Sequence, residues 1–183
     1  MIRPRHLSAA AAAAVLALSF AGAAAGGGAL HASASLVDTD GHSVGWARFT
    51  EDATGIVHVN VHAWGLTPGL HGIHIHAIGT CTLGQAPTAF ASAGGHHNPL
   101  GHTHGLEDPP GAHAGDLPNL IVNVAGRGHL DATTDRATLS GGATSVFDGD
   151  GSALVIHAAT DDQVTNPTGN SGGRVACGAI VAG

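Results

Sequence analysis

The sequence predicts an all-β fold, an antiparallel sandwich or barrel. From about Leu30 onward, about eight short stretches alternate Val, Ile, Thr and Ala with polar residues. Glycine and proline, 29 and 8 of the 183 residues, separate these stretches in the manner of turns. We find no convincing amphipathic helix and no fixed-period repeat beyond the first segment. Together these observations favour short antiparallel strands joined by glycine-rich turns.

The candidate strands follow one another along the chain with turn residues between them. They are Leu30–Val37, Ser43–Thr50, Gly55–Trp64, His71–Ala77, Leu120–Ala125, Gly128–Thr133, Ala153–Ala159 and Arg174–Val181. In the third, His58 and His62 alternate with Val57 and Val61, which predicts that the two histidines face solvent. In the seventh, His157 ends an apolar run.

A long segment without periodicity lies between Gly79 and Pro118. Loops of this length are uncommon inside a compact domain and are usually functional or disordered. This one holds Cys81 and five histidines. We expect metal and disulfide crosslinks to hold it where apolar packing cannot. A second irregular stretch, Thr160–Gly173, precedes the last strand.

The first segment has the pattern of a secretory signal peptide. Two arginines in the first five residues precede the apolar run Ala9–Leu18, and small residues follow, so that cleavage after Ala23 or after Ala25 fits. The alternative is a buried helix or a membrane anchor, but the run is too short for a bilayer core of ~30 Å. We therefore expect a signal peptide over 1–25, a domain over 26–183, and a protein that is secreted or held in the cell envelope or periplasm, with no membrane span in its mature form.

Two cysteines, Cys81 and Cys177, allow one intramolecular pairing. Outside the cytosol a disulfide persists, and closing a loop of this size stabilises a fold by about 4–5 kcal/mol in the chain-entropy model. The alternative is two free thiols.

Charge and composition argue against nucleic acid as a partner and point to metal ions. Thirteen acidic residues stand against six basic ones, all Arg, so the chain lacks the basic surface of a nucleic-acid-binding protein. Fifteen histidines, in contrast, are many for one domain, and histidine is the side chain most often used for metal and proton chemistry.

The segment Leu70–His76 places histidines on both faces of a strand. Because side chains alternate, His74 and His76 share one face while His71 lies on the other with the isoleucines. We expect His71 to be a buried, hydrogen-bonded structural residue, and His74 with His76 to project together toward a metal ion. An H-x-H pair alone is common on surfaces, but further histidines support this one. They are His96, His97, His102, His104, His113 with Asp116, and His157.

At this point the sequence resembles the copper,zinc superoxide dismutase family, over about Leu30 to the C-terminus. The motifs occur in the family's order and are 71–76, Gly79-Thr80-Cys81, 92–99, His104-Gly105, 113–117, Val155-Ile156-His157 with Asp161-Asp162, and 169–178. The resemblance implies an eight-stranded Greek-key β-barrel of flattened, sandwich-like form with a long metal-binding loop. A homodimer is the common state in the family, but the sequence shows no interface.

The resemblance also assigns roles by position. It implies copper ligands at His74, His76, His96 and His157, zinc ligands at His96, His104, His113 and Asp116, a carboxylate at Asp161 that links a ligand histidine of each metal, an anion-guiding arginine at Arg174, and a disulfide between Cys81 and Cys177. His96 would bridge the two metals.

The activity that the resemblance implies is an antioxidant oxidoreductase. Two superoxide anions and two protons would become oxygen and hydrogen peroxide by Cu(II)/Cu(I) cycling, with zinc in a structural and electrostatic role. The alternative is a secreted copper- and zinc-binding protein of the same fold without turnover. Two departures stand out: His97 replaces a frequent aromatic residue, and Thr160–Gly173 lacks the lysines with which many members steer superoxide. His97 and His102 lie inside the metal loop without an assigned role.

Overall fold

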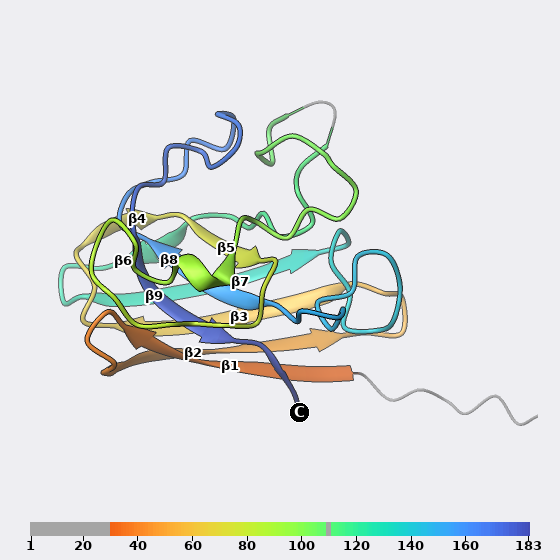
Figure 1. The fold of residues 1–183 in the computed structure, drawn as a ribbon, viewed down its shortest axis with the longest axis horizontal. Helices are drawn as coiled ribbons and strands as arrows, with labels where there is room; N and C mark the ends of the chain where they lie inside the picture. Colours follow the sequence, from red (N-terminus) through yellow and green to blue (C-terminus); the bar gives the residue numbers. More distant parts are fainter. Residues whose placement is uncertain (1–29, 109–110) are drawn as a thin grey trace, which may run out of the picture.

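The computed structural model describes residues 30–108 and 111–183 (Figure 1). The expected signal peptide, residues 1–25, lies outside them. The described chain forms β1 (Leu30–Asp38), β2 (Ser43–Glu51), β3 (Val57–Trp64), β4 (Gly69–His71), β5 (Ile73–His76), β6 (Leu120–Val122), β7 (Arg127–Thr134), β8 (Ala153–His157), β9 (Arg174–Ala179), β10 (Val181–Ala182) and a short 3-10 turn, η1 (Ala91–Ala93).

The strands form one antiparallel sheet that curls into a nearly closed barrel. Its order is β4-β6-β7-β3-β2-β1-β9-β8-β5, and β10 pairs with β1. The two ends of this order, β4 and β5, are consecutive parts of one chain segment, Gly69–His76. Its first half pairs with β6 and its second half with β8, so this segment closes the barrel.

The all-β Greek-key prediction is confirmed. The chain passes from β3 to β4 and from β7 to β8 between strands that are not neighbours in the sheet, and β3 pairs instead with β7. Two of the expected strands are each divided in two. The strand predicted over His71–Ala77 changes partner at Gly72, whose N–H donates to Ala159 and whose carbonyl accepts from His157.

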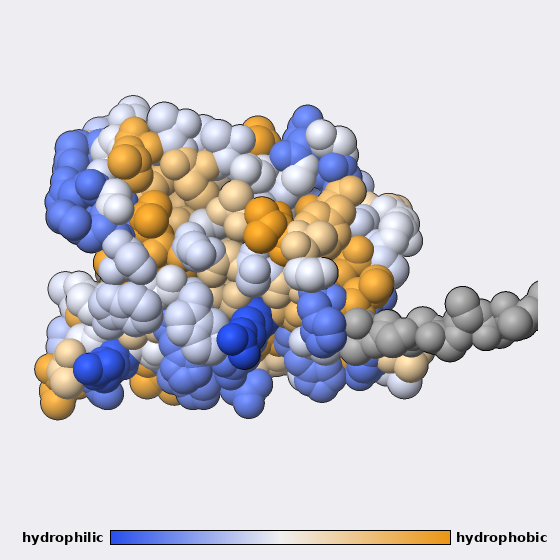
Figure 2. Space-filling model, turned by 90° about the horizontal axis from the view of Figure 1, so that it is seen from below, coloured by the Kyte–Doolittle hydropathy of each residue, from blue (hydrophilic) through white to orange (hydrophobic). Residues whose placement is uncertain are grey.

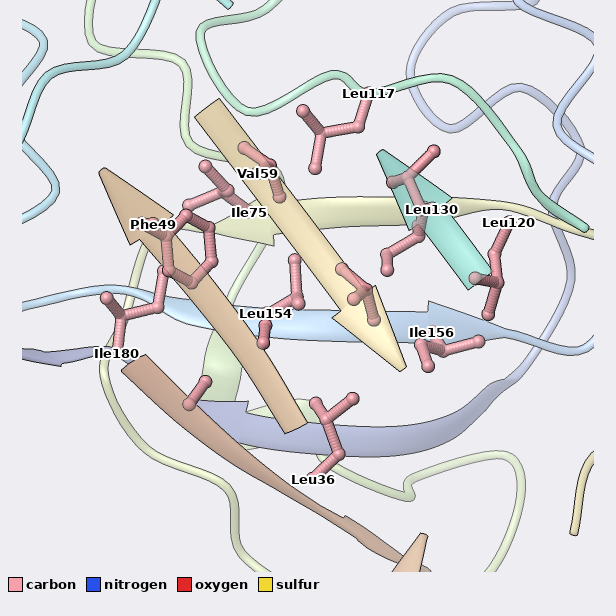
Figure 3. Close-up of a cluster of buried hydrophobic side chains, with 14 of the residues drawn as sticks. Leu36, Phe49, Val59, Ile75, Leu117, Leu120, Leu130, Leu154, Ile156 and Ile180 are labelled. Atoms are coloured by element: carbon pink, nitrogen blue, oxygen red, sulfur yellow. The ribbon is translucent and has the colours of Figure 1, made fainter. Parts of the chain in front are cut away.

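The core follows from the period-two alternation of the strands. In β3, Val57, Val59 and Val61 are buried, while His58 and His62 are exposed, as the alternation predicts. Because aromatic residues make up only 3% of the chain, aliphatic side chains fill most of the barrel interior. Figure 3 shows them converging from opposite walls, with Phe49 among the leucines and isoleucines.

Two long loops rise on the same side of the barrel. The later, green part of the loop after β5 and the blue loop between β8 and β9 both stand above the strands in Figure 1. Backbone N–H groups of Leu106 and Glu107 in the first loop donate to Gln163 in the second. Gly105 permits this approach, since it has a φ of 109° and a Cβ there would collide with the Gln163 carbonyl.

The surface mixes polar and apolar residues. On the face shown in Figure 2, hydrophilic residues gather along the lower edge and apolar residues across the middle. Within residues 30–108 and 111–183, no helix has the length and hydropathy needed to cross a bilayer.

Candidate metal centre

Adjacent strands bring three histidines to one place. His74 and His76 lie on the same face of β5, and β8, which pairs with β5, ends at His157. All four residues of β5 are buried, so the H-x-H face is covered by protein rather than open to solvent. The sequence predicted that the two histidines project together, and they do.

The long loop covers this face because its backbone pairs with β5. Ile75 donates its N–H to Gly115 and accepts from His97, and Gly115 donates to His97. Gly115 fits here because a Cβ would collide with the Ile75 carbonyl. This backbone pairing, rather than apolar packing, places His96 and Asp116 opposite His76 and His74.

Four histidines form what we call the first cluster: His74, His76, His96 and His157. One ring nitrogen from each lies within 4.8 Å of the others. The nitrogens of His76 and His157 that face each other, both Nε2, are 3.3 Å apart. His74 Nδ1 and His96 Nε2 are buried without a hydrogen-bond partner. Unpartnered imidazole nitrogens that converge in a buried pocket fit a metal ion, since leaving them unpaired is otherwise costly.

The opposite ring nitrogens of this cluster are held by the backbone. His76 Nδ1 lies 3.0 Å from the Gly94 carbonyl, and His157 Nδ1 lies 3.2 Å from the Gly172 carbonyl. Each carbonyl accepts the N–H, which leaves the lone pair on Nε2 directed into the cluster. Histidines that bind metals are oriented in this way in most metal proteins.

A second cluster surrounds one carboxylate and comprises His96, His104, His113 and Asp116. Asp116 Oδ1 lies 3.1 Å from His96 Nδ1, 3.1 Å from His104 Nδ1 and 3.4 Å from His113 Nδ1. Asp116 Oδ2 accepts N–H groups from Gly105 and His113, which fixes the carboxylate. Three imidazoles and a carboxylate match the mixed donors of a closed zinc site.

His96 belongs to both clusters. Its Nε2 faces the first and its Nδ1 the second, and its ring stacks on His74 with centroids 3.9 Å apart. At 8% exposure it is also the most exposed member of either cluster. One imidazole can therefore hold an ion at each of its nitrogens.

Asp161 connects the two clusters by hydrogen bonds to one histidine of each. It binds the ring nitrogens that do not face the cluster interiors. Its carboxylate accepts from His74 Nε2 at 2.5 Å and from His104 Nε2 at 3.0 Å. The loop keeps it in place through Gln163, whose N–H donates to the same carboxylate at 2.6 Å. Gly169 packs directly against it, where a Cβ would collide with the carboxylate.

Arg174 stands at the edge of the first cluster. It pairs with His157 across β8 and β9, and its guanidinium donates to the carbonyls of Phe90 and Gly94 at 2.5 Å each. A guanidinium carries more N–H groups than these two carbonyls use, so a fixed positive charge with free donors remains beside the histidines. Burial lowers the pKa of Arg174 from its ordinary value, but an arginine stays protonated.

The clusters hold their histidines in different protonation states. Burial lowers the pKa of His96 to about 4 and that of His157 to about 3, and it lowers the pKa of His76 well below its usual range. Burial acts against protonation of His104 as well, but hydrogen bonds to Asp116 and Asp161 outweigh it and raise the pKa of His104 to about 9. At neutral pH the first cluster therefore offers neutral imidazoles, which is the form that binds metals.

The metal-free protein is expected to lose stability as the pH falls from about 6.5 to about 4. In the unfolded chain, histidines become protonated as the pH falls through ~6.5, whereas in the folded protein His96 and His157 stay neutral until the pH is much lower. Protons therefore bind preferentially to the unfolded chain over this range. His104 acts oppositely, because its contribution is complete below pH 6.5 and is lost as the pH rises through about 9. Urea unfolding of the metal-free protein at pH 7, 5.5 and 4 measures this, and a free energy of unfolding that stays constant would contradict it.

The disulfide predicted between Cys81 and Cys177 is present. The two Cα atoms are 5.7 Å apart across 96 residues of sequence. Cys177 is buried in β9 beside Phe90 and Ala93 of the long loop. The bridge thus fastens the beginning of this loop to the barrel close to the first cluster.

The structure brings together the residues to which the resemblance assigned the two metals, whereas His97 and His102, which the sequence also suggested, lie outside both clusters. It also adds some that the sequence did not reveal. The Gly94 carbonyl accepts from both His76 and Arg174, and Arg136 donates to the Asp116 carbonyl at 3.2 Å. The Asn119 side chain donates to the Asp161 carbonyl and accepts the Asp161 N–H. Every residue has a backbone carbonyl, so the sequence does not show which carbonyl will orient a ligand. Nor does the presence of an arginine or asparagine in a loop show which group its side chain will bind.

The remaining histidines of this region hydrogen-bond to backbone carbonyls and have structural roles. His71 is buried, with Nδ1 2.6 Å from the His157 carbonyl and Nε2 2.8 Å from that of Thr67, as the sequence predicted. His97 and His102 are directed to the carbonyls of Thr144 and Ala112 instead of to either cluster.

Comparison with known proteins finds one family over most of the chain. Residues 43–180 match the family model described as copper/zinc superoxide dismutase (SODC). Superoxide dismutase [Cu-Zn] 2 of Aquifex aeolicus is 40% identical over 153 residues, 82% of this chain and 86% of that protein. Superoxide dismutase-like protein YojM of Bacillus subtilis is 40% identical over 148 residues, 80% of this chain and 74% of that protein.

Solved structures give the same result. The crystal structure of a superoxide dismutase-like protein from Bacillus subtilis superimposes with a TM-score of 0.75 at 40% identity, covering 81% of this chain and 97% of that one. A double mutant of such a protein superimposes with a TM-score of 0.74 at 41% identity, covering 80% and 95%.

Proposed function

The chain belongs to the copper/zinc superoxide dismutase family, and on that premise we propose that it is an active dismutase that converts two superoxide anions and two protons to oxygen and hydrogen peroxide. The observation that carries the proposal is the combination of a histidine shared by two clusters with a fixed arginine beside the first. A protein that only stores metal needs the ligands but has no need of that arginine.

The two clusters differ in the ion that they suit. The first offers four imidazoles, a set that suits copper, and we assign it to copper through His74 Nδ1 and the Nε2 atoms of His76, His96 and His157. The second, with three imidazoles and Asp116, we assign to zinc. Copper, when bound, supplies the redox couple that accepts an electron from one superoxide and returns it to another.

The protein's own groups bind and orient the anion. Arg174 holds its position through Phe90 and Gly94, so its remaining N–H groups are available to an oxygen of superoxide beside the first cluster. The charge is already in place when the anion arrives, and no reorganisation is required at the moment of reaction. The formal net charge of the chain is −7, so this local cation must oppose a general repulsion of the substrate.

His96 is the group placed to handle a proton. Its Nε2 faces the first cluster, and its Nδ1 lies 3.1 Å from Asp116 Oδ1 in the second. Asp116 accepts the Nδ1 N–H when that hydrogen is present, and zinc held at Nδ1 would keep the ring in the same orientation when Nε2 carries the hydrogen. Whenever Nε2 is not bound to copper it can carry a proton, which would lie next to the reduced oxygen species and could be released to it. Asp161 keeps His74 and His104 in fixed tautomers by accepting from both Nε2 atoms.

A disulfide favours a location outside the cytosol. We therefore propose that the protein acts after export, in the cell envelope or beyond, with residues 1–25 as the signal peptide.

Replacing Arg174 by glutamine is expected to lower kcat/KM for superoxide by roughly tenfold to a hundredfold, since hydrogen bonds to charged groups contribute ~1.5–3 kcal/mol. Copper and zinc contents should stay unchanged, because Arg174 donates to carbonyls and not to the histidines.

With no lysine in the chain, the wild-type rate should depend only weakly on ionic strength. Stopped-flow decay of superoxide at several salt concentrations measures both effects. A steep fall of the wild-type rate with salt, or an Arg174→Gln rate equal to wild type, would count against this role.

A further inference from the structure

A second group of histidines lies on the outer face of the barrel, away from both clusters. His62 on β3 and His129 on β7 are directly opposite each other in the register of the two strands. Both side chains are exposed, and their ring centroids are 4.6 Å apart with planes tilted by 42°. In the first cluster, ring centroids of neighbouring histidines lie between 3.9 and 6.4 Å apart. The outer pair therefore has the spacing of imidazoles that could share an ion.

The backbone already orients one of these rings. His129 Nδ1 lies 3.2 Å from the Val61 carbonyl, which accepts its N–H and leaves the lone pair on Nε2. The same device orients His76 and His157 in the first cluster. It is also the arrangement in which metal-binding histidines are most often found.

The strands beneath the pair are anchored by buried neighbours. Val61 and Leu130, the neighbours of His62 and His129, are buried in the core, so the Cβ atoms of the pair are fixed relative to each other. Directly opposite residues of an antiparallel pair have Cβ atoms ~4.5–5.5 Å apart. A cation that joins the two rings therefore requires no rearrangement of the sheet.

The charges and rings around the pair are compatible with a cation. Asp131 is exposed one step along β7 on the same face, diagonal to His62. Two cations lie near the pair. Arg127 is exposed on the same face of β7, one step from His129 on the side opposite Asp131. Arg48 lies over the Trp46 ring, 5.1 Å from its centroid. The Trp46 ring itself lies 4.5 Å from that of His62.

From these contacts we propose that His62 and His129 form a second, surface site for a late first-row transition-metal ion, bound through His129 Nε2 and a ring nitrogen of His62. Among such ions, imidazole sites bind Cu²⁺ most tightly. Nothing in the dismutase chemistry requires this site, so the proposal stands apart from the activity proposed above.

The test titrates Cu²⁺ into the full chain whose two clusters are already loaded with copper and zinc. Bound Cu²⁺ quenches tryptophan fluorescence at short range, and Trp46 lies against His62. We expect saturable quenching and one additional equivalent of copper by equilibrium dialysis. His62→Asn and His129→Asn should each weaken this binding at least ~10-fold, since loss of even an outer-shell partner weakens metal sites ~10–100-fold.

Two matched variants serve as controls. His58→Asn removes another exposed histidine from the same face of β3, whose ring lies by Asp52. His42→Asn removes a histidine near two aspartates, close to Trp64 through the Trp64–Ser43 hydrogen bond. Both should keep the quenching and the extra equivalent. Quenching that survives in both His62→Asn and His129→Asn, or that disappears in His42→Asn or His58→Asn, would overturn the proposal.

Discussion

Replacing His96 by alanine is expected to lower superoxide turnover by more than ~100-fold, because even outer-shell changes cost metal sites ~10–100-fold and this one removes a ligand from both clusters. The loss should affect both metals at once. His96 Nε2 faces the first cluster and Nδ1 lies 3.1 Å from Asp116 in the second. The measurement is superoxide decay together with the copper and zinc contents of the purified protein.

His102→Ala is the matched control for this prediction. It makes the same substitution in the same loop, at a histidine directed to the Ala112 carbonyl and not to either cluster. It should retain near wild-type turnover and both metals. If His96→Ala kept its turnover, or if it lost no more activity than His102→Ala, the assignment of a shared histidine would be wrong.

Replacing Cys81 and Cys177 together by alanine is expected to lower the free energy of unfolding by about 4–5 kcal/mol, because the bridge closes a long loop. Alanine is the better choice than serine here, since Cys177 is fully buried among apolar side chains. Urea unfolding of the metal-free double variant and of the oxidised wild type measures the difference.

The reduced wild type provides the control for this second prediction. It lacks the bridge but retains both sulfur atoms, so it should lose stability to the same extent as the double variant. A double variant within about 0.5 kcal/mol of the oxidised wild type, the size of an ordinary surface substitution, would contradict the stabilising role of the bridge.

The strands could be predicted from the sequence because alternation and turns are local signals. Val57, Val59 and Val61 face the core and their neighbours face solvent, as the pattern indicates. The division of the segment 69–76 could not be predicted, since it results from a change of partner at Gly72. A change of partner depends on strands distant in sequence and leaves no local pattern.

The candidate site was predictable in its residues but not in its support. The histidines and Asp116 stand in recognisable motifs, whereas the carbonyls of Gly94 and Gly172 that orient two of these rings carry no side-chain signal. Nor could alternation show that the H-x-H face of β5 is buried. The backbone of the long loop covers that face by pairing with Ile75.

The most direct test of the dismutase proposal is to load the protein with copper and zinc and to follow superoxide decay, with His157→Ala alongside. His157 supplies one of the four first-cluster nitrogens and pairs with Arg174 across the sheet. We expect fast catalytic decay in the wild type that the variant lacks and that cyanide inhibits. Full copper and zinc occupancy in the wild type, without turnover, would contradict it and would identify a metal-binding protein of the same fold.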